Sequence, residues 1–486
     1  MTIEAKPQPK ILLTGATGCI GGRLLDALEA NGRPVRCMTR RPEALNGKVG
    51  PQSSIVRGDC FDPASLAAAF SGVETAYYLV HSMGGSTDFE ARDREAARNF
   101  GDAARVAGVR RIVYVGGLGA AEGLSKHLRS RHETGEVLRA SGVPVIEFRS
   151  GIVLGAGSLS FELIRALVER LPVMVCPSWV RTPTQPIALA DLVAYLVASI
   201  DLSHGESRLF EIGGADVVSY REIMREYARQ RGLRRLLIPV PLLTPRLSSL
   251  WLGLTTPVYA RVGRELVDGL RNATVVNDAA ARTAFPITPL GLRAAITRAT
   301  GEEDEAFATT PWSEGALASG TVLRWGGVRI RSRIIHSAAV DLPVGTDAAF
   351  APIRRIGGDR GWYCGDWIWR LRGLFDLLLG GVGMNRGRRD PENLAAGDVL
   401  DCWRVDVCEP NVRLRLTAEM KLPGRGWLEF DVTPRDGGGS RVRQTAVFDP
   451  SGLWGRFYWH ALYPIHVLLF GGLLRSVARR ATASAP

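Results

Sequence analysis

The sequence predicts two folds in succession: an α/β fold with a doubly wound parallel sheet over residues 11–300, and an α+β domain over residues 320–486. From residue 11 to about 151, strand-length apolar segments alternate with segments of helical spacing, as a parallel sheet requires. Residues 301–319 begin with an acidic run and continue with few large apolar residues, which is typical of a linker. After this linker, strand-length segments are separated by hairpin turn sequences. Residues 1–10 are expected to be a tail.

The first apolar segment, residues 11–14, runs directly into glycines at positions 15, 18 and 21. In a strand–turn–helix unit, the first two glycines let the backbone approach a pyrophosphate, and the third lets the helix pack closely on the strand. A helix over 20–30 and a second strand over 35–39 favour this interpretation over an ordinary surface turn. The residues expected at this site are Gly15, Thr17, Gly18, Cys19, Ile20 and Gly21.

The rest of the first sheet follows the same alternation. Further strands are expected at 54–57, 75–80, 111–115 and 143–149, with helices at 63–70, 89–107 and 130–140. Residues 151–300 are less regular and are expected to cover a substrate, with a strand over 209–212 and a helix over 220–232. The proline-punctuated apolar stretch 238–257 either lines an apolar pocket or forms a core helix.

The residues after the second and third strands indicate which dinucleotide is bound. An acidic residue after the second strand would hold a ribose 2′-hydroxyl, whereas this chain has Arg40 and Arg41, which suit a 2′-phosphate. NADP(H) is therefore expected in preference to NAD(H), unless both arginines are solvated surface charges. Asp59, followed by Cys60, is placed either to reach the adenine or to cap a helix. His81, after the fourth strand, is expected to face the nicotinamide.

Three motifs carry a resemblance to a known family: Thr-Gly-Ala-Thr-Gly-Cys-Ile-Gly over 14–21, Gly-Asp at 58–59, and Tyr-Tyr-Leu-Val-His-Ser over 77–82. They resemble the atypical, NmrA-like and extended branch of the short-chain dehydrogenase/reductase superfamily, which implies a Rossmann sheet. That superfamily carries a serine after the fifth strand and a Tyr-x-x-x-Lys pair on the next helix. This sequence has Val-Gly-Gly-Leu over 115–118, and His127 and Arg131 align with the tyrosine and lysine.

His127 and Arg131 are the expected catalytic residues. An imidazole can exchange a proton near neutral pH, and a guanidinium four residues away lies on the same helical face. The alternative is that His127 only bonds solvent or backbone at the start of a helix. The expected activity is oxidoreduction of a bulky apolar carbonyl, enone or quinone-like substrate. The alternative is a non-catalytic, NADP(H)-sensing regulatory or assembly protein of the NmrA type, which the missing serine, tyrosine and lysine favour.

The second domain is expected to have strands at 328–340, 399–407, 412–420, 427–432 and 441–448, a helix at 367–379 and an apolar closing segment at 453–474. This order resembles the START-like, helix-grip architecture, and also the domain of unknown function that often follows NmrA-like reductase domains in bacteria. The resemblance implies an apolar cavity between sheet and last helix. Five aromatic residues either line it or belong to the core: Trp362, Tyr363, Trp367, Trp369 and Trp403.

Composition excludes several functions. The net charge of +12 is spread over the chain without a basic tail or nucleic-acid motif, so no nucleic acid is expected as a partner. The seven cysteines are scattered and the seven histidines lack metal-ligand spacing, so no metal site is expected. A cytoplasmic protein with an apolar small-molecule ligand is predicted. The closing segment, with 18 uncharged residues over 457–474, is expected to be a lid helix, with peripheral contact to the inner face of the membrane as the alternative.

Overall fold

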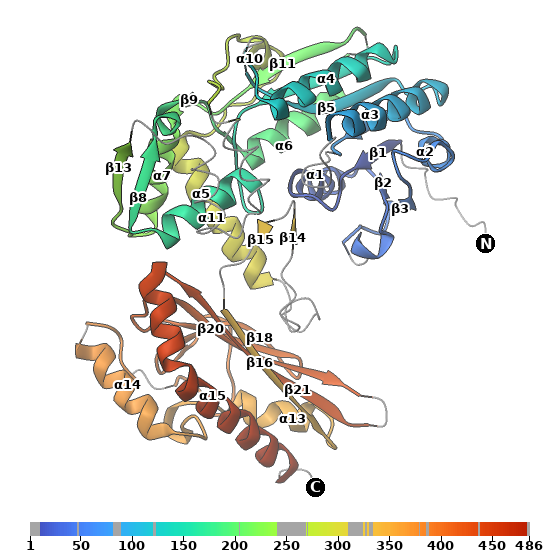
Figure 1. Cartoon of the computed structure of the whole chain (residues 1–486). Helices are drawn as coiled ribbons and strands as arrows, with labels where there is room; N and C mark the ends of the chain where they lie inside the picture. Colours follow the sequence, from blue (N-terminus) through green and yellow to red (C-terminus); the bar gives the residue numbers. More distant parts are fainter. Residues whose placement is uncertain are drawn as a thin grey trace, which may run out of the picture. The chain divides into compact units, whose positions relative to one another are not determined.

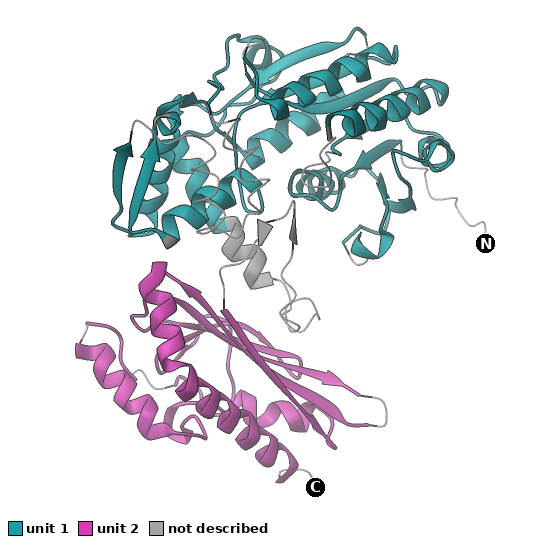
Figure 2. Ribbon diagram, in the orientation of Figure 1, with its two compact units in different colours: residues 1–305, 324–330 teal, residues 306–323, 331–486 magenta. Residues whose placement is uncertain are grey.

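The computed structural model forms two compact units, Met1–Glu305 with Arg324–Ile330 and Ala306–Leu323 with Arg331–Pro486 (Figure 2). The structure describes residues 10–45, 48–80, 89–119, 123–203, 205–240, 269, 271–309, 324–325, 328–329, 334–378, 380–384, 388–435 and 438–483.

A seven-stranded parallel sheet forms the centre of the first unit, in the order β11-β6-β5-β4-β1-β2-β3 (Figure 1). The predicted doubly wound parallel fold is confirmed. Because the strand order reverses between β1 and β4, a crevice is expected where these two strands end. The strands are β1 (Ile11–Thr14), β2 (Val35–Thr39), β3 (Ser54–Arg57), β4 (Thr75–Tyr78), β5 (Arg111–Gly117), β6 (Val145–Ser150) and β11 (Arg208–Ile212).

Helices cover both faces of this sheet. On one face α1 (Cys19–Ala30) and α6 (Leu189–Ala198) pack a core that includes Leu24 and Leu192. On the other face α2 (Pro63–Phe70), α3 (Phe89–Val106) and α4 (Lys126–Ala140) pack around Phe100. Helix α4 begins four residues before its predicted start at 130, because the Ser125 hydroxyl accepts a hydrogen bond from the Leu128 N–H at 3.3 Å and caps the helix.

A third core of the first unit is formed by residues between 152 and 299. Helix α11 (Leu292–Thr309) contributes Ile296 to this core and continues through the acidic run at 301–305, where the sequence predicted a linker. Of the stretch 238–257, residues 241–257 lie outside the described residues. The other elements are η1 (Pro42–Leu45), β7 (Val153–Leu154), α5 (Leu159–Arg170), β8 (Val173–Pro177), η2 (Ser178–Arg181), β9 (Pro183–Thr184), β10 (Ile187–Ala188), η3 (Ser199–Asp201), β12 (Val218–Ser219), α7 (Tyr220–Gln230), β13 (Leu236–Val240), α10 (Ala280–Ala284), β14 (Arg324–Trp325) and β15 (Val328–Arg329).

The second unit is a six-stranded antiparallel sheet in the order β16-β21-β20-β19-β18-β17, packed against α15 and α13. Phe430 and Phe448 of the sheet share a core with Trp459 and Leu473 of α15. The sequence missed α13, which contains a proline, and predicted one strand at 328–340 where β15 and β16 are separate. The elements are β16 (Ile334–Leu342), α13 (Thr346–Arg354), η4 (Gly358–Arg360), α14 (Asp366–Leu378), β17 (Val399–Leu400), β18 (Trp403–Glu409), β19 (Arg413–Ala418), β20 (Gly424–Pro434), β21 (Ser440–Pro450) and α15 (Gly452–Ala483).

The aromatic residues that could have lined a cavity are mostly core residues. The ring of Trp362 lies 5.3 Å from that of Trp369 and 5.9 Å from that of Trp403, and all three are buried. Tyr363 donates a hydrogen bond to the Pro352 carbonyl at 3.0 Å, while Trp367 is 70% exposed.

Two ionisable groups of the second unit, the buried Glu429 and the half-buried His466, make its stability depend on pH. Burial raises the pKa of the Glu429 carboxyl from 4.5 to about 7 even though Arg415 lies 2.6 Å away, and burial lowers the pKa of His466 from 6.5 to about 4. Glu429 therefore contributes less stability as the pH rises from about 4.5 to 7. His466 contributes less as the pH falls from about 6.5 to 4, and each effect amounts to roughly 3 kcal/mol.

Because the two effects have opposite signs, each is expected to appear when the other is removed. In Glu429→Gln the free energy of unfolding of the second unit should rise more steeply with pH than in the wild type. In His466→Leu it should fall with pH over the same range. Urea unfolding followed by tryptophan fluorescence at pH 4.5, 5.5 and 7 measures how the free energy of unfolding changes with pH in each variant. The same pH dependence in both variants as in the wild type would contradict these assignments.

Candidate functional site

The glycine turn at the end of β1 is shaped by three backbone constraints. Gly15 has φ +74°, and the Gly18 N–H donates to the Gly15 carbonyl at 2.8 Å. A Cβ on Gly21 would lie 2.1 Å from that same carbonyl oxygen, so only glycine lets α1 pack this close to the turn. The Thr14 hydroxyl donates to the Tyr77 carbonyl at 2.9 Å and accepts from the Leu79 N–H at 3.1 Å, which joins the ends of β1 and β4.

The first turn of α1 is suited to an anion. Its N-cap, Gly18, provides no side-chain hydrogen bond, and no acidic residue lies in the first turn. The N–H groups at this end of the helix therefore point into the crevice with the positive end of the helix dipole. The Cys19 thiol donates to the Ala156 carbonyl at 3.3 Å. This hydrogen bond joins the first turn of α1 to the loop between β7 and α5.

The loops after β2 and β3 form a second part of the crevice wall. Arg40 and Arg41 are both exposed and both line it. The Asp59 carboxylate accepts the Phe61 N–H at 3.1 Å, whereas the cap of α2 is Asp62, which accepts the Ala64 N–H at 3.1 Å. Asp59 therefore braces its own loop with one carboxylate oxygen and does not cap the helix.

These features border one cavity of about 690 Å³. It brings together every predicted site residue that the structure describes, and His81 lies outside the described residues. The predicted residues along its wall are Gly15, Thr17, Gly18, Cys19, Ile20, Gly21, Arg40, Arg41, Asp59, Cys60, His127 and Arg131. Within the described ranges no group of three histidine, cysteine or carboxylate side chains could hold a metal ion.

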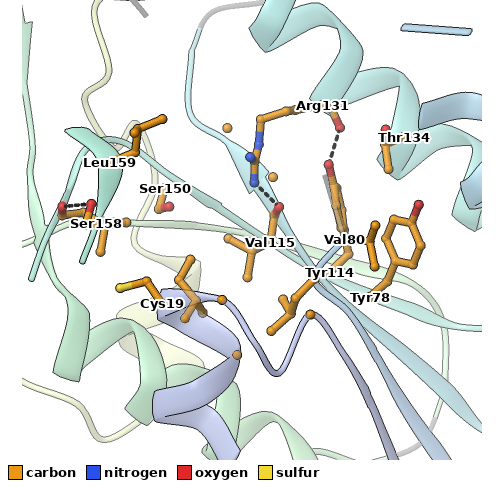
Figure 3. Close-up of a pocket in the computed structure, with 18 of the residues that line it drawn as sticks. Cys19, Tyr78, Val80, Tyr114, Val115, Arg131, Thr134, Ser150, Ser158 and Leu159 are labelled. Carbon is orange, nitrogen blue, oxygen red and sulfur yellow. Dashed lines mark hydrogen bonds between the residues drawn. The ribbon is translucent and has the colours of Figure 1, made fainter. Parts of the chain in front are cut away.

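The two expected catalytic residues lie on the α4 wall of the cavity, where β5 ends. The Arg131 guanidinium donates to the Val115 carbonyl, and its main-chain carbonyl accepts the Tyr114 hydroxyl at 2.9 Å (Figure 3). His127 is half-buried one helical turn earlier. His132, on the same helix, has Nε2 2.9 Å from the Gly117 carbonyl, and burial lowers its pKa, which is typical of a structural histidine.

Several hydroxyl side chains on the opposite wall are site residues that the sequence did not predict, among them Ser150, Ser158, Tyr220 and Thr274. Ser150 ends β6 and Ser158 precedes α5 (Figure 3). Tyr220 is 3% exposed, and the Thr184 and Thr274 hydroxyls, which lie 2.6 Å apart, hydrogen bond to its hydroxyl. Burial raises the pKa of Tyr220 to about 12, so the hydroxyl is protonated at neutral pH. Ser150 could have been found from its place at the end of a parallel strand.

Apolar side chains line the cavity together with these hydroxyls. Ile152, Val153 and Leu159 line the cavity on one side, and Leu118 and Leu128 line it on the other. The cavity therefore combines a phosphate-binding end with an end that suits an apolar molecule carrying one polar group.

Comparisons with known proteins agree with this geometry. Residues 15–150 match a family model described as NAD(P)H-binding, and residues 331–473 match one described as a protein of unknown function, DUF2867. The ceramide reductase of Caulobacter vibrioides is 28% identical over 269 residues, which are 52% of this chain and 82% of that protein. Sterol demethylase protein B of Methylococcus capsulatus is 26% identical over 231 residues, 46% of this chain and 66% of that protein.

Two solved structures share the fold of the first unit. Triphenylmethane reductase from Citrobacter sp., complexed with NADP(H), covers 60% of this chain and 99% of its own with 18% identity and a TM-score of 0.50. An NADPH-dependent quinone oxidoreductase from Escherichia coli, complexed with NADPH, covers 59% of this chain and 98% of its own with 19% identity and a TM-score of 0.50.

Residues 15–150 therefore form an NAD(P)H-binding domain, and the first unit has the Rossmann-like fold that these two solved structures share. The predicted cofactor class is confirmed. The second unit matches a family without an assigned function, and its START-like relationship stays a prediction.

Proposed function

We propose that this chain is an NADP(H)-dependent oxidoreductase that acts on a bulky apolar carbonyl, enone or quinone-like molecule. The observation that carries the proposal is one cavity whose wall includes a phosphate-binding turn, buried hydroxyls and aliphatic side chains. The names of the two curated relatives above, a ceramide reductase and a sterol demethylase protein, denote lipid chemistry and support an apolar substrate.

The residues of this chain have distinct roles in the proposed reaction. Bound NADPH supplies the hydride. Arg40 and Arg41 hold the 2′-phosphate, and the first turn of α1 holds the pyrophosphate. Arg131, fixed by the Val115 carbonyl, positions the ribose and the substrate oxygen. His127 delivers the proton that balances the hydride, because its half-buried imidazole lines the cavity and histidine is the side chain most often used as a general acid.

The activity can be tested with purified full-length protein. NADPH is mixed with a panel of quinones, enones and long-chain aldehydes, and the nicotinamide absorbance is followed with time. We expect substrate-dependent oxidation with at least one class of apolar acceptor. Saturable NADPH binding without oxidation by any member of the panel would contradict the enzyme proposal.

Removing the imidazole tests the proton donor. In His127→Ala we expect kcat to fall roughly 100-fold, because general acid catalysis contributes about 10²–10⁴ in rate, while the Kd for NADPH stays unchanged. Lys126→Ala is the matched control, since Lys126 is exposed at the start of the same helix and does not line the cavity. An unchanged kcat in His127→Ala would remove this residue from the catalytic site.

A second function is a non-catalytic, NADP(H)-sensing regulatory or assembly role of the NmrA type. The favouring observation is the end of β5, where Val115, Gly116 and Gly117 stand in place of the usual serine and the Val115 carbonyl engages Arg131. In this case the second, START-like unit would hold an apolar ligand or a partner without turnover. A change in partner or ligand affinity on adding NADPH, with no oxidation, would distinguish this function.

A further inference from the structure

The exposed large apolar side chains of the described chain are concentrated on two helices of the second unit. On α14 five of them share one face at helical spacing, Trp367, Leu371, Leu374, Phe375 and Leu378, and Leu377 lies beside that face. On α15 five of them also share one face, Leu453, Trp454, Phe457, Ile465 and Leu468, and Tyr463 and Val467 lie along its flank. Soluble proteins rarely leave such stripes in water, so these two faces require an explanation.

The two helices are neighbours. Burial and the neighbouring His336 lower the pKa of His466 on α15, and Arg372 of α14 is close enough to add to this effect. A Cβ on Gly365, just before α14, would lie 2.4 Å from the Leu469 side chain of α15. A Cβ on Gly472 of α15 would likewise lie 2.1 Å from the Cys364 sulfur. Figure 1 shows α14 running alongside α15. The two exposed stripes therefore belong to adjacent helices, and we call them together the apolar ridge.

The charges around the apolar ridge are complementary to anionic headgroups. The face of α15 that carries Phe457 and Leu468 continues, seven and eleven residues after Leu468, into the exposed Arg475 and Arg479. Helix α15 has no acidic residue along its entire length. On α14, Arg370 is exposed beside the stripe. Of the two aspartates of this helix, Asp376 is buried and accepts hydrogen bonds from the Gly383 and Lys421 N–H groups, and the exposed Asp366 at the first turn accepts the Trp362 N–H at 2.7 Å.

The packing of α15 favours lying on a membrane over crossing one. The length of α15 and the mean hydropathy of 1.4 over its most apolar 18-residue segment would suffice for a membrane span. However, 33% of that segment is buried in the unit. Leu469, Phe470 and Leu473 face the sheet core, so a span would pull them out of that core. A helix with one face in a protein core and the other exposed and apolar is suited to the plane of the interface, where tryptophan and phenylalanine are favoured.

We propose that the apolar ridge is a docking surface for an anionic lipid bilayer, with the exposed apolar side chains of α14 and α15 inserted among the acyl chains and Arg370, Arg475 and Arg479 on the headgroups. This surface holds the protein peripherally, by helices that lie along the membrane. It is independent of the proposed reaction, because it uses no residue of the NAD(P)H cavity.

The test measures binding of the full-length protein to vesicles by sedimentation. Vesicles of phosphatidylcholine alone are compared with vesicles in which about a third of the lipid is phosphatidylglycerol. We expect at least about ten-fold tighter binding to the anionic vesicles, and loss of most of that difference at high salt. The double variant Trp367→Glu/Leu468→Glu should lower binding to both kinds of vesicle by at least ten-fold.

A control variant and a charge variant separate the apolar contribution to vesicle binding from the electrostatic contribution. Val106→Glu is the matched control, because Val106 is 80% exposed on α3 of the first unit, and its binding should equal that of the wild type. Arg475→Gln/Arg479→Gln should reduce the preference for anionic vesicles while leaving weak binding to neutral ones. A urea unfolding transition of the second unit that matches the wild type shows that each variant of α14 and α15 is folded.

Three results would overturn the proposal. The first is wild-type protein that stays in the supernatant with both vesicles. The second is a concentration-dependent dimer that Trp367→Glu/Leu468→Glu dissociates in the absence of lipid binding, which would assign the ridge to a second copy of the chain. The third is bound protein that resists both high salt and alkaline extraction, which would indicate a span.

Discussion

Replacing Gly21 with alanine is expected to abolish NADPH binding, with a loss in affinity of at least about 100-fold. The added Cβ would lie 2.1 Å from the Gly15 carbonyl oxygen and 3.0 Å from the Ala16 nitrogen, both of which are main-chain atoms that cannot rotate away. The turn must then open, and the N–H groups of the first turn of α1 move away from the pyrophosphate. NADPH should raise the melting temperature of the wild type but not that of Gly21→Ala.

The adjacent glycine provides the control for this change. Gly22 belongs to the same helix, and its added Cβ would meet only the Ala16 carbonyl oxygen at 3.4 Å, which is near ordinary contact. Gly22→Ala should therefore keep its NADPH affinity within a few-fold of the wild type. If Gly21→Ala is folded, as judged by circular dichroism, and binds NADPH as tightly as Gly22→Ala does, the turn is not the pyrophosphate site.

The double variant Arg40→Ala/Arg41→Ala is expected to lose most of the preference for NADPH over NADH. Each charge-assisted hydrogen bond from a guanidinium to the 2′-phosphate is worth about 1.5–3 kcal/mol, so the loss of both should lower the NADPH affinity by at least about 100-fold. The NADH affinity should change little, because NADH has a ribose hydroxyl at that position. Titration of both coenzymes into the same preparation measures the ratio directly.

Arg105→Ala is a control for the loss of positive charge. Arg105 is exposed on α3 beside Asp102 and does not line the cavity, so this change should leave both affinities intact. Equal losses of NADPH and NADH affinity in the Arg40/Arg41 variant would show that these arginines support the loop and do not select the 2′-phosphate.

The sequence predicted the sheet because its signals there are local. Strands 35–39 and 54–57 and helix 63–70 were predicted with their observed bounds, since apolar spacing and turn residues delimit them. Where one distant contact decides a boundary, the prediction was wrong. Strand β5 continues through Gly116 and Gly117 because Arg149 and Ser150 of β6 pair with them, and no propensity of these glycines indicates a strand.

The residues of the candidate site also fall into those that local sequence signals predicted and those that only tertiary packing brings to the cavity. The glycine turn, Arg40, Arg41 and Asp59 follow predicted strands directly, so the common edge of a parallel sheet brings them together. Tyr220 and Thr274 belong to the irregular region after the sheet, and only tertiary packing places both on the cavity wall opposite α4. Their distance in the sequence left no motif from which their role could be inferred.

The most direct test of the account is isothermal titration calorimetry of NADPH and NADH into the full-length protein. We expect saturable binding of one NADPH per chain and weaker binding of NADH, because one cavity combines the glycine turn at the end of β1 with the two arginines after β2. An absence of saturable binding by both coenzymes would contradict it.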